Sequence, residues 1–371
     1  MANIYETDLP QNPANYEALS PLSYLKRSAT LYPEYPAIVH GDLVQNWGET
    51  YQRCIKFASA LSKAGIGKGD TVAVMLPNIP EMFELHFSVA MTGAVLNAIN
   101  TRLDDKTVAF ILDHGEAKVF ITDAEFSSVT ASALDIANST PLVLDVEDPL
   151  FTEGELVGSM TFNEMLATGD EIFDWSLPDD EWDAISLNYT SGTTGNPKGV
   201  VLDFLSNDNT KVLTQGSNPL KINFSGNNDF YSYLPLNHIA ERMVVEFTCF
   251  RYGGTISFVE SLDTFSENLQ EVQPTIFLAV PRIWTKFQMG ILAKVSQEKL
   301  DILLKIPIIS GILKKKFKKA LGLSRARATV SGAAPLQESQ REWFYKLGIK
   351  ILNGYGMTEN CAVCTQLDGE I

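Results

Sequence analysis

The sequence predicts an α/β protein with two doubly wound, mostly parallel sheets flanked by helices. Short apolar runs alternate with helical periodicity through both halves of the chain, which is the pattern of stacked βα units. The chain has 371 residues, of which 45% are hydrophobic and 20% charged. That composition is ordinary for globular proteins, and the length exceeds what one hydrophobic core usually organises. We therefore expect two α/β subdomains, over residues 1–180 and 181–371.

The first half begins with a helix that contains Tyr51, Cys54 and Leu61 and ends at Gly65. The apolar run at residues 71–76 follows and is typical of a strand buried on both faces. An acidic stretch at residues 147–183 is expected to be a connector with one short helix at 162–167. Between them we expect helices at 80–92, 107–113 and 125–137, and strands at 95–98, 118–121 and 141–146.

The second half repeats this alternation, and we expect a second sheet to begin at the apolar residues 184–187. Further strands are predicted at 230–234, 255–259, 275–280, 328–330 and 350–352. Helices are predicted at 240–250, 262–271, 282–296 and 337–347.

The charge balance restricts the classes of molecule that the chain is expected to bind. The chain has 29 basic and 45 acidic residues, a formal net charge of −16, which disfavours nucleic-acid binding. Four cysteines are few for this length, and residues 1–10 have no basic region followed by an apolar run, so we expect a cytoplasmic protein. Cys361 and Cys364 have redox or half-zinc-site spacing. Because no histidine lies near them in sequence, we expect two buried small hydrophobic residues instead.

Residues 189–200 read Tyr-Thr-Ser-Gly-Thr-Thr-Gly-Asn-Pro-Lys-Gly-Val, the composition of a loop that binds a polyphosphate. Glycines let backbone N–H groups turn inward, hydroxyls add donors, and Lys198 adds a positive charge. The spacing is not that of a Walker A loop. The alternative is a flexible surface loop, which the apolar lead at 184–187 argues against. The candidate ligands are Thr190, Ser191, Gly192, Thr193, Thr194, Gly195 and Lys198.

Residues 302–323 combine an apolar run with lysines at positions 314, 315, 316, 318 and 319. The apolar part is too short and too interrupted to span a bilayer. Two interpretations remain open: a solvated helix face, or peripheral contact with an anionic membrane surface.

A second long motif, Asn353-Gly-Tyr-Gly-Met-Thr-Glu359, follows the phosphate loop. Together the two motifs resemble the adenylate-forming enzymes, which include acyl-CoA synthetases, peptide-synthetase adenylation domains and luciferases. The segments 234–239 (Leu-Pro-Leu-Asn-His-Ile) and 331–336 (Ser-Gly-Ala-Ala-Pro-Leu) also look like acyl-CoA synthetase motifs. The resemblance covers nearly the whole chain and implies the N-terminal core of the adenylate-forming fold.

The resemblance implies ATP-dependent activation of a fatty acid to an acyl-adenylate and then to acyl-CoA, with ATP, Mg²⁺ and coenzyme A. Such chemistry depends on donors, cations and in-line positioning more than on a protein nucleophile. By similarity, residues 190–195 and Lys198 hold the β- and γ-phosphates, with Thr194 and Lys198 in catalytic roles. Further catalytic roles fall by similarity to His238, which closes over the carboxylate, Thr358, a phosphate contact, and Glu359, the Mg²⁺ ligand.

The adenine site is implied by the same resemblance. Tyr355 looks like the residue that stacks on adenine, with Asn353, Gly354 and Gly356 beside it. Gly332, Ala333 and Ala334 border adenine and the acyl tunnel, where small residues make room. Each role has a simpler alternative: Tyr355 as a core residue, Glu359 as a helix-start carboxylate, His238 as a packed histidine, and residues 332–334 as a plain strand-to-helix turn.

The two halves of the chain favour different branches of the family. Residues 234–242 and 280–284 resemble long-chain fatty acyl-CoA synthetases, whereas residues 24–36, 97–103 and 181–189 resemble medium-chain and sulfur-containing short-chain ligases. A composite chain is one explanation. The segment after Val200 also lacks the histidine-bearing turn that relatives usually have.

The chain ends at Ile371, whereas the family continues into a third subdomain and a mobile C-terminal domain. We therefore expect the isolated chain to be weak or inactive as a ligase. The alternatives are a non-catalytic module that binds nucleotide or acyl chains, and an inactive fragment of such a ligase. Acyl chain length, thiol acceptor and oligomeric state are not set by these residues.

Overall fold

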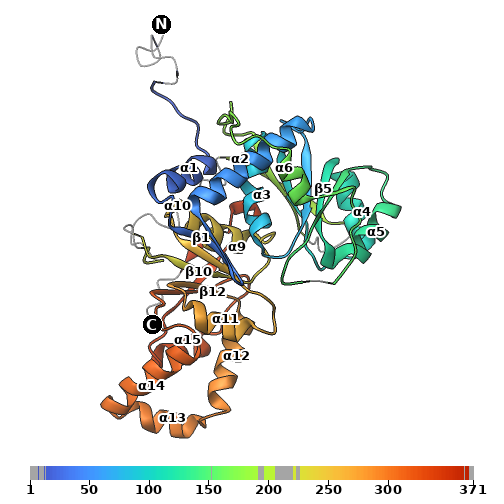
Figure 1. Ribbon diagram of the computed structural model, residues 1–371. Coiled ribbons are helices and arrows are strands. Elements are labelled where there is room, and N and C mark those ends of the chain that lie inside the picture. Colours follow the sequence, from blue (N-terminus) through green and yellow to red (C-terminus); the bar gives the residue numbers. More distant parts are fainter. Residues whose placement is uncertain are drawn as a thin grey trace.

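The structure, a computed structural model, describes residues 7, 12, 14–151, 153–190, 196–204, 220–222, 226–362 and 364–366. Two sheets with helices on their faces make up this part of the chain, as the sequence predicts (Figure 1). The sheets are mostly parallel; the antiparallel pairs are β1–β2, β14–β15 and β8–β9.

The larger sheet has eight strands in the order β15-β14-β13-β12-β10-β11-β1-β2. They are β1 (Pro36–His40), β2 (Leu43–Asn46), β10 (Asp229–Ser232), β11 (Thr255–Phe258), β12 (Ile276–Ala279), β13 (Ala328–Ser331), β14 (Ile351–Tyr355) and β15 (Thr365–Gln366).

The smaller sheet has seven strands in the order β7-β6-β5-β3-β4-β8-β9. They are β3 (Thr71–Met75), β4 (Val95–Ala98), β5 (Ala117–Asp123), β6 (Leu142–Val146), β7 (Met160–Thr161), β8 (Ala184–Thr190) and β9 (Lys198–Asp203).

The sheets do not divide the chain at residues 180 and 181. The prediction that a second sheet begins at residues 184–187 is wrong, because β8 pairs with β4 through Leu96 and Ser186 in the smaller sheet. In turn β1, from the first half, pairs with β11 in the larger sheet through Ile38 and Ile256. Short buried strands carry no local signal for their partner, so the sheets exchange segments across the expected boundary.

The predicted helices are present near their expected bounds, α1 was not predicted, and the segment predicted as a helix at 240–250 contains a turn of π-helix, η2. They are α1 (Pro21–Leu31), α2 (Trp47–Lys63), α3 (Pro80–Met91), α4 (Asp105–His114), α5 (Ser127–Ile136), α6 (Phe162–Ala167), α9 (Ile239–Glu241), η2 (Arg242–Phe247), α10 (Thr248–Arg251), α11 (Phe265–Val272), α12 (Pro281–Leu292), α13 (Gln297–Leu304), α14 (Pro307–Ala320) and α15 (Glu338–Lys346). The 3₁₀ turns are η1 (Ala124–Phe126) and η3 (Thr358–Asn360).

Local sequence explains where several helices begin. Asn46 and Glu49 form a capping box at the start of α2, and proline occupies the first turn of α3, α12 and α14. Nearly every residue of α3 is buried, because this helix lies in a core shared by the two sheets. Phe87 of α3 packs edge-on against Phe250 of α10, with ring centroids 4.8 Å apart.

Two further observations concern the surface. Among the described residues, no helix is long and apolar enough to cross a membrane. The expectation of two buried cysteines is half wrong: Cys361 is buried, whereas Cys364 is exposed. Cys361 follows η3 and packs inward, and the chain then turns back toward β14, which leaves Cys364 at the surface.

Candidate functional site

The predicted motifs gather where parallel strands end. The segments 332–336 and 356–359 follow β13 and β14, which are adjacent and in register with Ser331 opposite Asn353. Residues 233–238 follow β10 of the same sheet, and Thr190 ends β8 of the other sheet. In open α/β sheets, ligands bind in the crevice outside the carboxyl ends of the strands.

Two asparagines, Asn188 in β8 and Asn78 in the loop after β3, hold the turn that carries His238. Asn188 Nδ2 donates to the carbonyl oxygen of Asn237 at 2.9 Å. Asn78 Nδ2 donates to Ser232 Oγ at 2.8 Å and to the Leu234 carbonyl at 2.6 Å, while Asn78 Oδ1 accepts from the N–H of Leu236 at 3.0 Å. Sequence reasoning missed both residues: Asn78 follows the buried strand β3 and Asn188 lies two residues before the end of β8, and a polar residue close to a strand end does not by itself identify its partner.

His238 is exposed and caps the first turn of α9. Its Nδ1 accepts a hydrogen bond from the N–H of Ala240 at 3.3 Å. Partial removal from solvent lowers the pKa of the imidazole below its usual value. A neutral ring that accepts at Nδ1 carries its proton on Nε2, so His238 can offer a donor to an anion. The packed-histidine interpretation does not fit this exposure.

The phosphate loop connects β8 and β9, an antiparallel hairpin in which Thr190 is opposite Lys198. The hydroxyl of Thr190 donates to the Lys198 carbonyl at 3.5 Å, and the Lys198 side chain is exposed. Gly199 lies so close to Leu187 that a Cβ there would be 2.9 Å from its Cδ1. The remaining predicted ligands lie outside the described residues: Ser191, Gly192, Thr193, Thr194 and Gly195.

The turn after β13 is backbone-strained. Ala333 has φ of 65°, a left-handed conformation that costs a non-glycine residue about 1–2 kcal/mol. Gly332 is half-buried, and a Cβ there would lie 3.5 Å from the Gly354 carbonyl oxygen, an ordinary contact. Ala333 and Ala334 are exposed, so small side chains face open space at this edge.

The turn after β14 presents Tyr355 and Glu359. Tyr355 is 59% exposed, so its alternative as a core residue is wrong. A Cβ on Gly356 would collide with the Ala362 carbonyl, so this position requires glycine. Glu359 is exposed within η3, which packs beside β9, the strand that begins at Lys198. The structure therefore places the second motif beside the strand that follows the phosphate loop.

A cluster of buried ionisable residues lies beneath this edge, and the sequence did not reveal it. Glu241, Arg242, Glu246 and His86 are at most 3% exposed. Glu241 accepts from the N–H of Tyr233 at 3.1 Å, and burial raises the pKa of its carboxyl to about 8. His86 Nδ1 lies 2.8 Å from Glu246 Oε1 without hydrogen-bond alignment. Burial raises the pKa of Glu246 and lowers that of His86.

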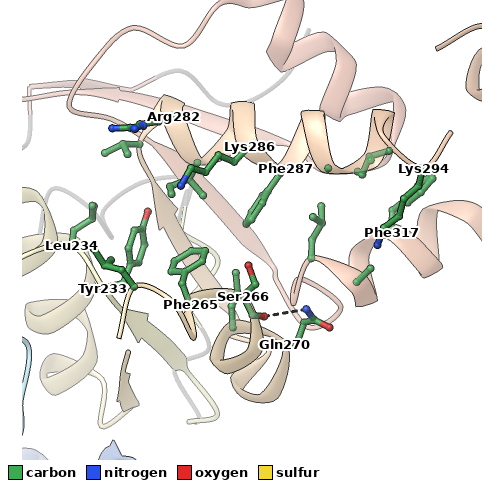
Figure 2. A pocket seen from close by; sticks show the side chains of 18 of the residues that line it. Tyr233, Leu234, Phe265, Ser266, Gln270, Arg282, Lys286, Phe287, Lys294 and Phe317 are labelled. Atoms are coloured by element: carbon green, nitrogen blue, oxygen red, sulfur yellow. Dashed lines mark hydrogen bonds between the residues drawn. The ribbon is translucent and has the colours of Figure 1, made fainter. Parts of the chain in front are cut away.

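A cavity of about 780 Å³ begins at the same turn (Figure 2). Tyr233 and Leu234 line one end, and Phe317 of α14 and Lys294 the other (Figure 2). Apolar side chains of α11 and α12, including Phe265 and Phe287, form much of its wall. Ligand sites of small molecules usually have this size and this mostly apolar lining.

Glu359 is the residue that fits a magnesium ion. Mg²⁺ is usually bound by one or two carboxylates together with substrate phosphates, and Glu359 offers one exposed carboxylate beside the phosphate-loop strand. Within the described part of the chain, no group of three His, Cys, Asp or Glu residues could hold a metal by itself. The donor set thus suits an ion that arrives with a nucleotide.

Comparison with known proteins settles the family. The profile of the AMP-binding enzyme family matches residues 25–370. The chain is a member of the AMP-binding enzyme family. The fold of this family member is also that of the N-terminal domain of FACL13 from Mycobacterium tuberculosis, with a TM-score of 0.72 at 24% identity over 94% of this chain and 78% of that one. A long-chain-fatty-acid–CoA ligase from Archaeoglobus fulgidus shares the fold with a TM-score of 0.73 at 19% identity, over 97% of this chain and 68% of that one.

Curated relatives of this chain include plant CoA ligases. Acetate–CoA ligase CCL3 of Humulus lupulus is 46% identical over 207 residues, which cover 53% of this chain and 36% of that protein. Acetate/butyrate–CoA ligase AAE7 of Arabidopsis thaliana is 44% identical over 207 residues, with the same coverage of 53% and 36%. The chain thus spans about a third of the length of these relatives, and they match about half of it.

Proposed function

We propose that this AMP-binding protein takes part in ATP-dependent activation of a fatty acid to an acyl-adenylate and then to acyl-CoA. One observation carries the proposal: the η3 turn with Glu359 packs beside β9, the strand that begins at Lys198, and Asn188 of the neighbouring strand β8 holds the turn that carries His238. Exposed cations and donors at strand ends suit a reaction in which charge develops on phosphate oxygens.

The proposed chemistry has two steps. A carboxylate oxygen attacks the α-phosphorus of ATP, and pyrophosphate leaves with the electron pair of the broken P–O bond. The thiolate of coenzyme A then attacks the acyl carbon, and AMP leaves. Mg²⁺ held by Glu359 would neutralise phosphate charge.

This chain's residues would position the reactants. Lys198 would stabilise negative charge on the phosphates, and Tyr355 would stack on adenine. His238 Nε2–H would donate to the attacking carboxylate and orient it. Thr358 and the backbone of the strained 332–334 turn would border the nucleotide.

The cavity supports an acid longer than acetate. It begins at Tyr233 and Leu234, only a few residues before His238, so a carboxylate at His238 would point its tail toward the apolar walls. Apolar surface removed from water contributes about 0.8 kcal/mol per CH₂ group, so each added methylene should strengthen binding until the cavity is filled. The plant relatives named for acetate and butyrate favour a shorter acid. The acid that gives the fastest exchange distinguishes a long-chain substrate from a short-chain one.

The test is ATP–pyrophosphate exchange on the purified chain with acetate, octanoate and palmitate. Slow exchange that Lys198→Ala abolishes and that is fastest with octanoate or palmitate is the expected result. Fastest exchange with acetate would contradict the fatty-acid assignment. ATP binding without any exchange would show a nucleotide-binding module instead.

A cavity variant sharpens this test. A Cβ at Gly290, which lines the cavity, would have no atom within 4 Å, so Gly290→Phe introduces a ring there without a clash at the backbone. We expect exchange with palmitate to fall at least tenfold and exchange with acetate to stay unchanged. Gly311→Phe is the matched control, because this glycine of α14 is equally open and does not line the cavity.

A further inference from the structure

A helical lobe, defined here as residues 297–323, projects away from the two sheets and contains α13 and α14 (Figure 1). It exposes more large apolar surface than a solvated helix pair needs. Its isoleucines at positions 302, 306, 308 and 312 are 62%, 44%, 79% and 61% exposed. Clustered exposed apolar side chains of this kind mark interaction surfaces.

The outer face of α14 combines these isoleucines with lysines. Ile308, Ile312, Lys315, Lys316 and Lys319 are all exposed, and their spacing of four, seven, eight and eleven residues from Ile308 places them on one helix face. Ser310 and Phe317 are buried on the opposite face. The helix is thus amphipathic, with apolar residues in the first half of its outer face and cations in the second.

The charge of the lobe is opposite to that of the chain. Residues 297–323 contain seven lysines and two acids, a net charge of +5, whereas the whole chain carries −16. Burial and the neighbouring Lys314 and Lys221 lower the pKa of the Lys318 ammonium, as expected where cations crowd together. Lys318 also lines a second cavity of about 350 Å³ with Arg327 and Lys350, which extends the positive surface to the base of α14.

The same helix reaches the large cavity. Phe317, Ala320 and Leu321 line its far end, opposite Tyr233 and Leu234 (Figure 2). These residues lie on the side of α14 turned away from its exposed isoleucines, so a molecule held at the outer face would be separated from this end of the cavity by the width of one helix.

We propose that the helical lobe docks on an anionic membrane surface, with its isoleucines inserted among the lipids and its lysines at the headgroups. A fatty acid dissolved in that membrane would then enter the cavity at the α14 end. Docking itself is independent of the proposed ligase function; only the entry of the acid rests on it. The occupant is a lipid surface because both halves of the outer face are matched, apolar side chains by acyl chains and lysines by anionic headgroups.

The test is co-sedimentation of the full chain with phosphatidylcholine vesicles that contain or lack phosphatidylglycerol. We expect binding to the anionic vesicles that weakens as salt is added. The variant Lys315→Ala/Lys316→Ala should bind about 30-fold more weakly, since each lysine near the surface contributes roughly 1 kcal/mol. Lys106→Ala/Lys118→Ala is the matched control, because these exposed lysines lie on α4 and β5, outside the lobe.

A second variant separates insertion from charge. Ile308→Ser/Ile312→Ser keeps every lysine and should weaken vesicle binding at least tenfold without changing circular dichroism. Equal binding to both vesicle types, or no loss in either lobe variant, would overturn the proposal. Self-association without lipid that Ile308→Ser/Ile312→Ser abolishes would also overturn it, because a second copy of the chain would then be the occupant.

Rates of ATP–pyrophosphate exchange test whether the acid enters the cavity from the membrane. Anionic vesicles should raise the rate with palmitate in the parent chain and not in the lobe variants, and should leave the rate with acetate unchanged. Vesicle binding without any exchange would retain docking and reject the ligase function. Exchange without vesicle binding would retain the ligase function and reject docking.

Discussion

Charged groups at the carboxyl edge of the sheets and ionisable groups just beneath it occupy opposite surroundings. Lys198 and Glu359 are exposed. Glu241, Arg242 and Glu246 are almost completely buried on or beside a π-helical turn. Within the described residues, both nitrogen atoms Nε and Nη1 of Arg242 and both carboxylate oxygens of Glu246 have no hydrogen-bond partner.

The exposed groups at the edge are therefore tied to ligand binding, and the buried cluster is tied to the stability of the fold. An exposed charge stays hydrated and costs little in folding, whereas a buried one carries a desolvation penalty that its partners only partly offset. The cluster connects elements that all reach the site, because Glu246 faces His86 of α3 and Arg242 lies near Cys361, just after η3. Substitutions at the edge should change ligand binding, and those in the cluster should change the free energy of unfolding.

The largest expected effect is a fall in stability as the pH rises from 5 to 8. The folded chain keeps the proton of Glu241 up to a pKa of about 8, whereas the unfolded chain releases it near 4.5. The folded state therefore binds more protons in this window, and the free energy of unfolding decreases with pH, by an amount on the order of 4 kcal/mol. Urea unfolding at several pH values measures this slope.

Glu241→Gln is the matched variant for that slope. Glutamine keeps an oxygen that can accept from the N–H of Tyr233 and does not titrate. The slope should become shallower and not vanish, because the carboxyls of Glu81 and Asp123 also have pKa values raised to about 7 by burial. An unchanged slope in the variant would show that Glu241 does not hold its proton as described.

Replacing the buried Arg242 and Glu246 by apolar residues should stabilise the chain. Arg242→Met/Glu246→Met removes four buried polar atoms without hydrogen bonds, and such replacements are worth about 1–4 kcal/mol. Denaturant unfolding is the measurement, with Arg325→Met as the control, because Arg325 pairs with Asp229 at the surface and should contribute under about 1 kcal/mol. A less stable double variant would mean that interactions of Arg242 and Glu246 outweigh the desolvation penalty of burying them.

At the exposed edge, Tyr355→Ala should weaken ATP binding and leave stability unchanged. Stacking of a base on an aromatic side chain is worth about 1–3 kcal/mol, roughly 5- to 150-fold in the dissociation constant. The side chain is 59% exposed, so little packing is lost. Calorimetric titration with ATP tests this, and Tyr355→Phe should bind like the parent. Normal ATP affinity in the alanine variant would exclude a stacking role.

The smallest effect concerns the strained turn. Ala333→Gly should raise the free energy of unfolding by up to about 1 kcal/mol, because glycine adopts its φ of 65° without strain. Ala334→Gly is the matched control: Ala334 has no positive φ, so glycine there should destabilise by about 0.4–1 kcal/mol. Equal effects at the two positions would show that Ala333 is not strained.

The sequence predicted most elements and both long motifs, because strong periodicity and turn residues act locally. The strand Val95–Ala98 and the helix Phe162–Ala167 have the predicted bounds. The hairpin β1–β2 was missed because its strands are short, and Cys364 was wrongly expected to be buried. Asn78 and Asn188 were missed because a polar residue near a strand end is unremarkable until its partners in the other sheet are known.

By itself, the sequence determined the α/β class, the resemblance to adenylate-forming enzymes and the residues of the two motifs. These features depend on neighbours along the chain, because local residues set the backbone conformation and supply the glycines and hydroxyl groups of each motif. Only the tertiary structure decided that β8 belongs to the smaller sheet and β1 to the larger one, that four ionisable side chains share one buried cluster, and that α14 borders the cavity while facing solvent. These features depend on contacts between residues far apart in sequence. Pairing and burial of that kind follow from how whole layers pack, and no local pattern encodes them.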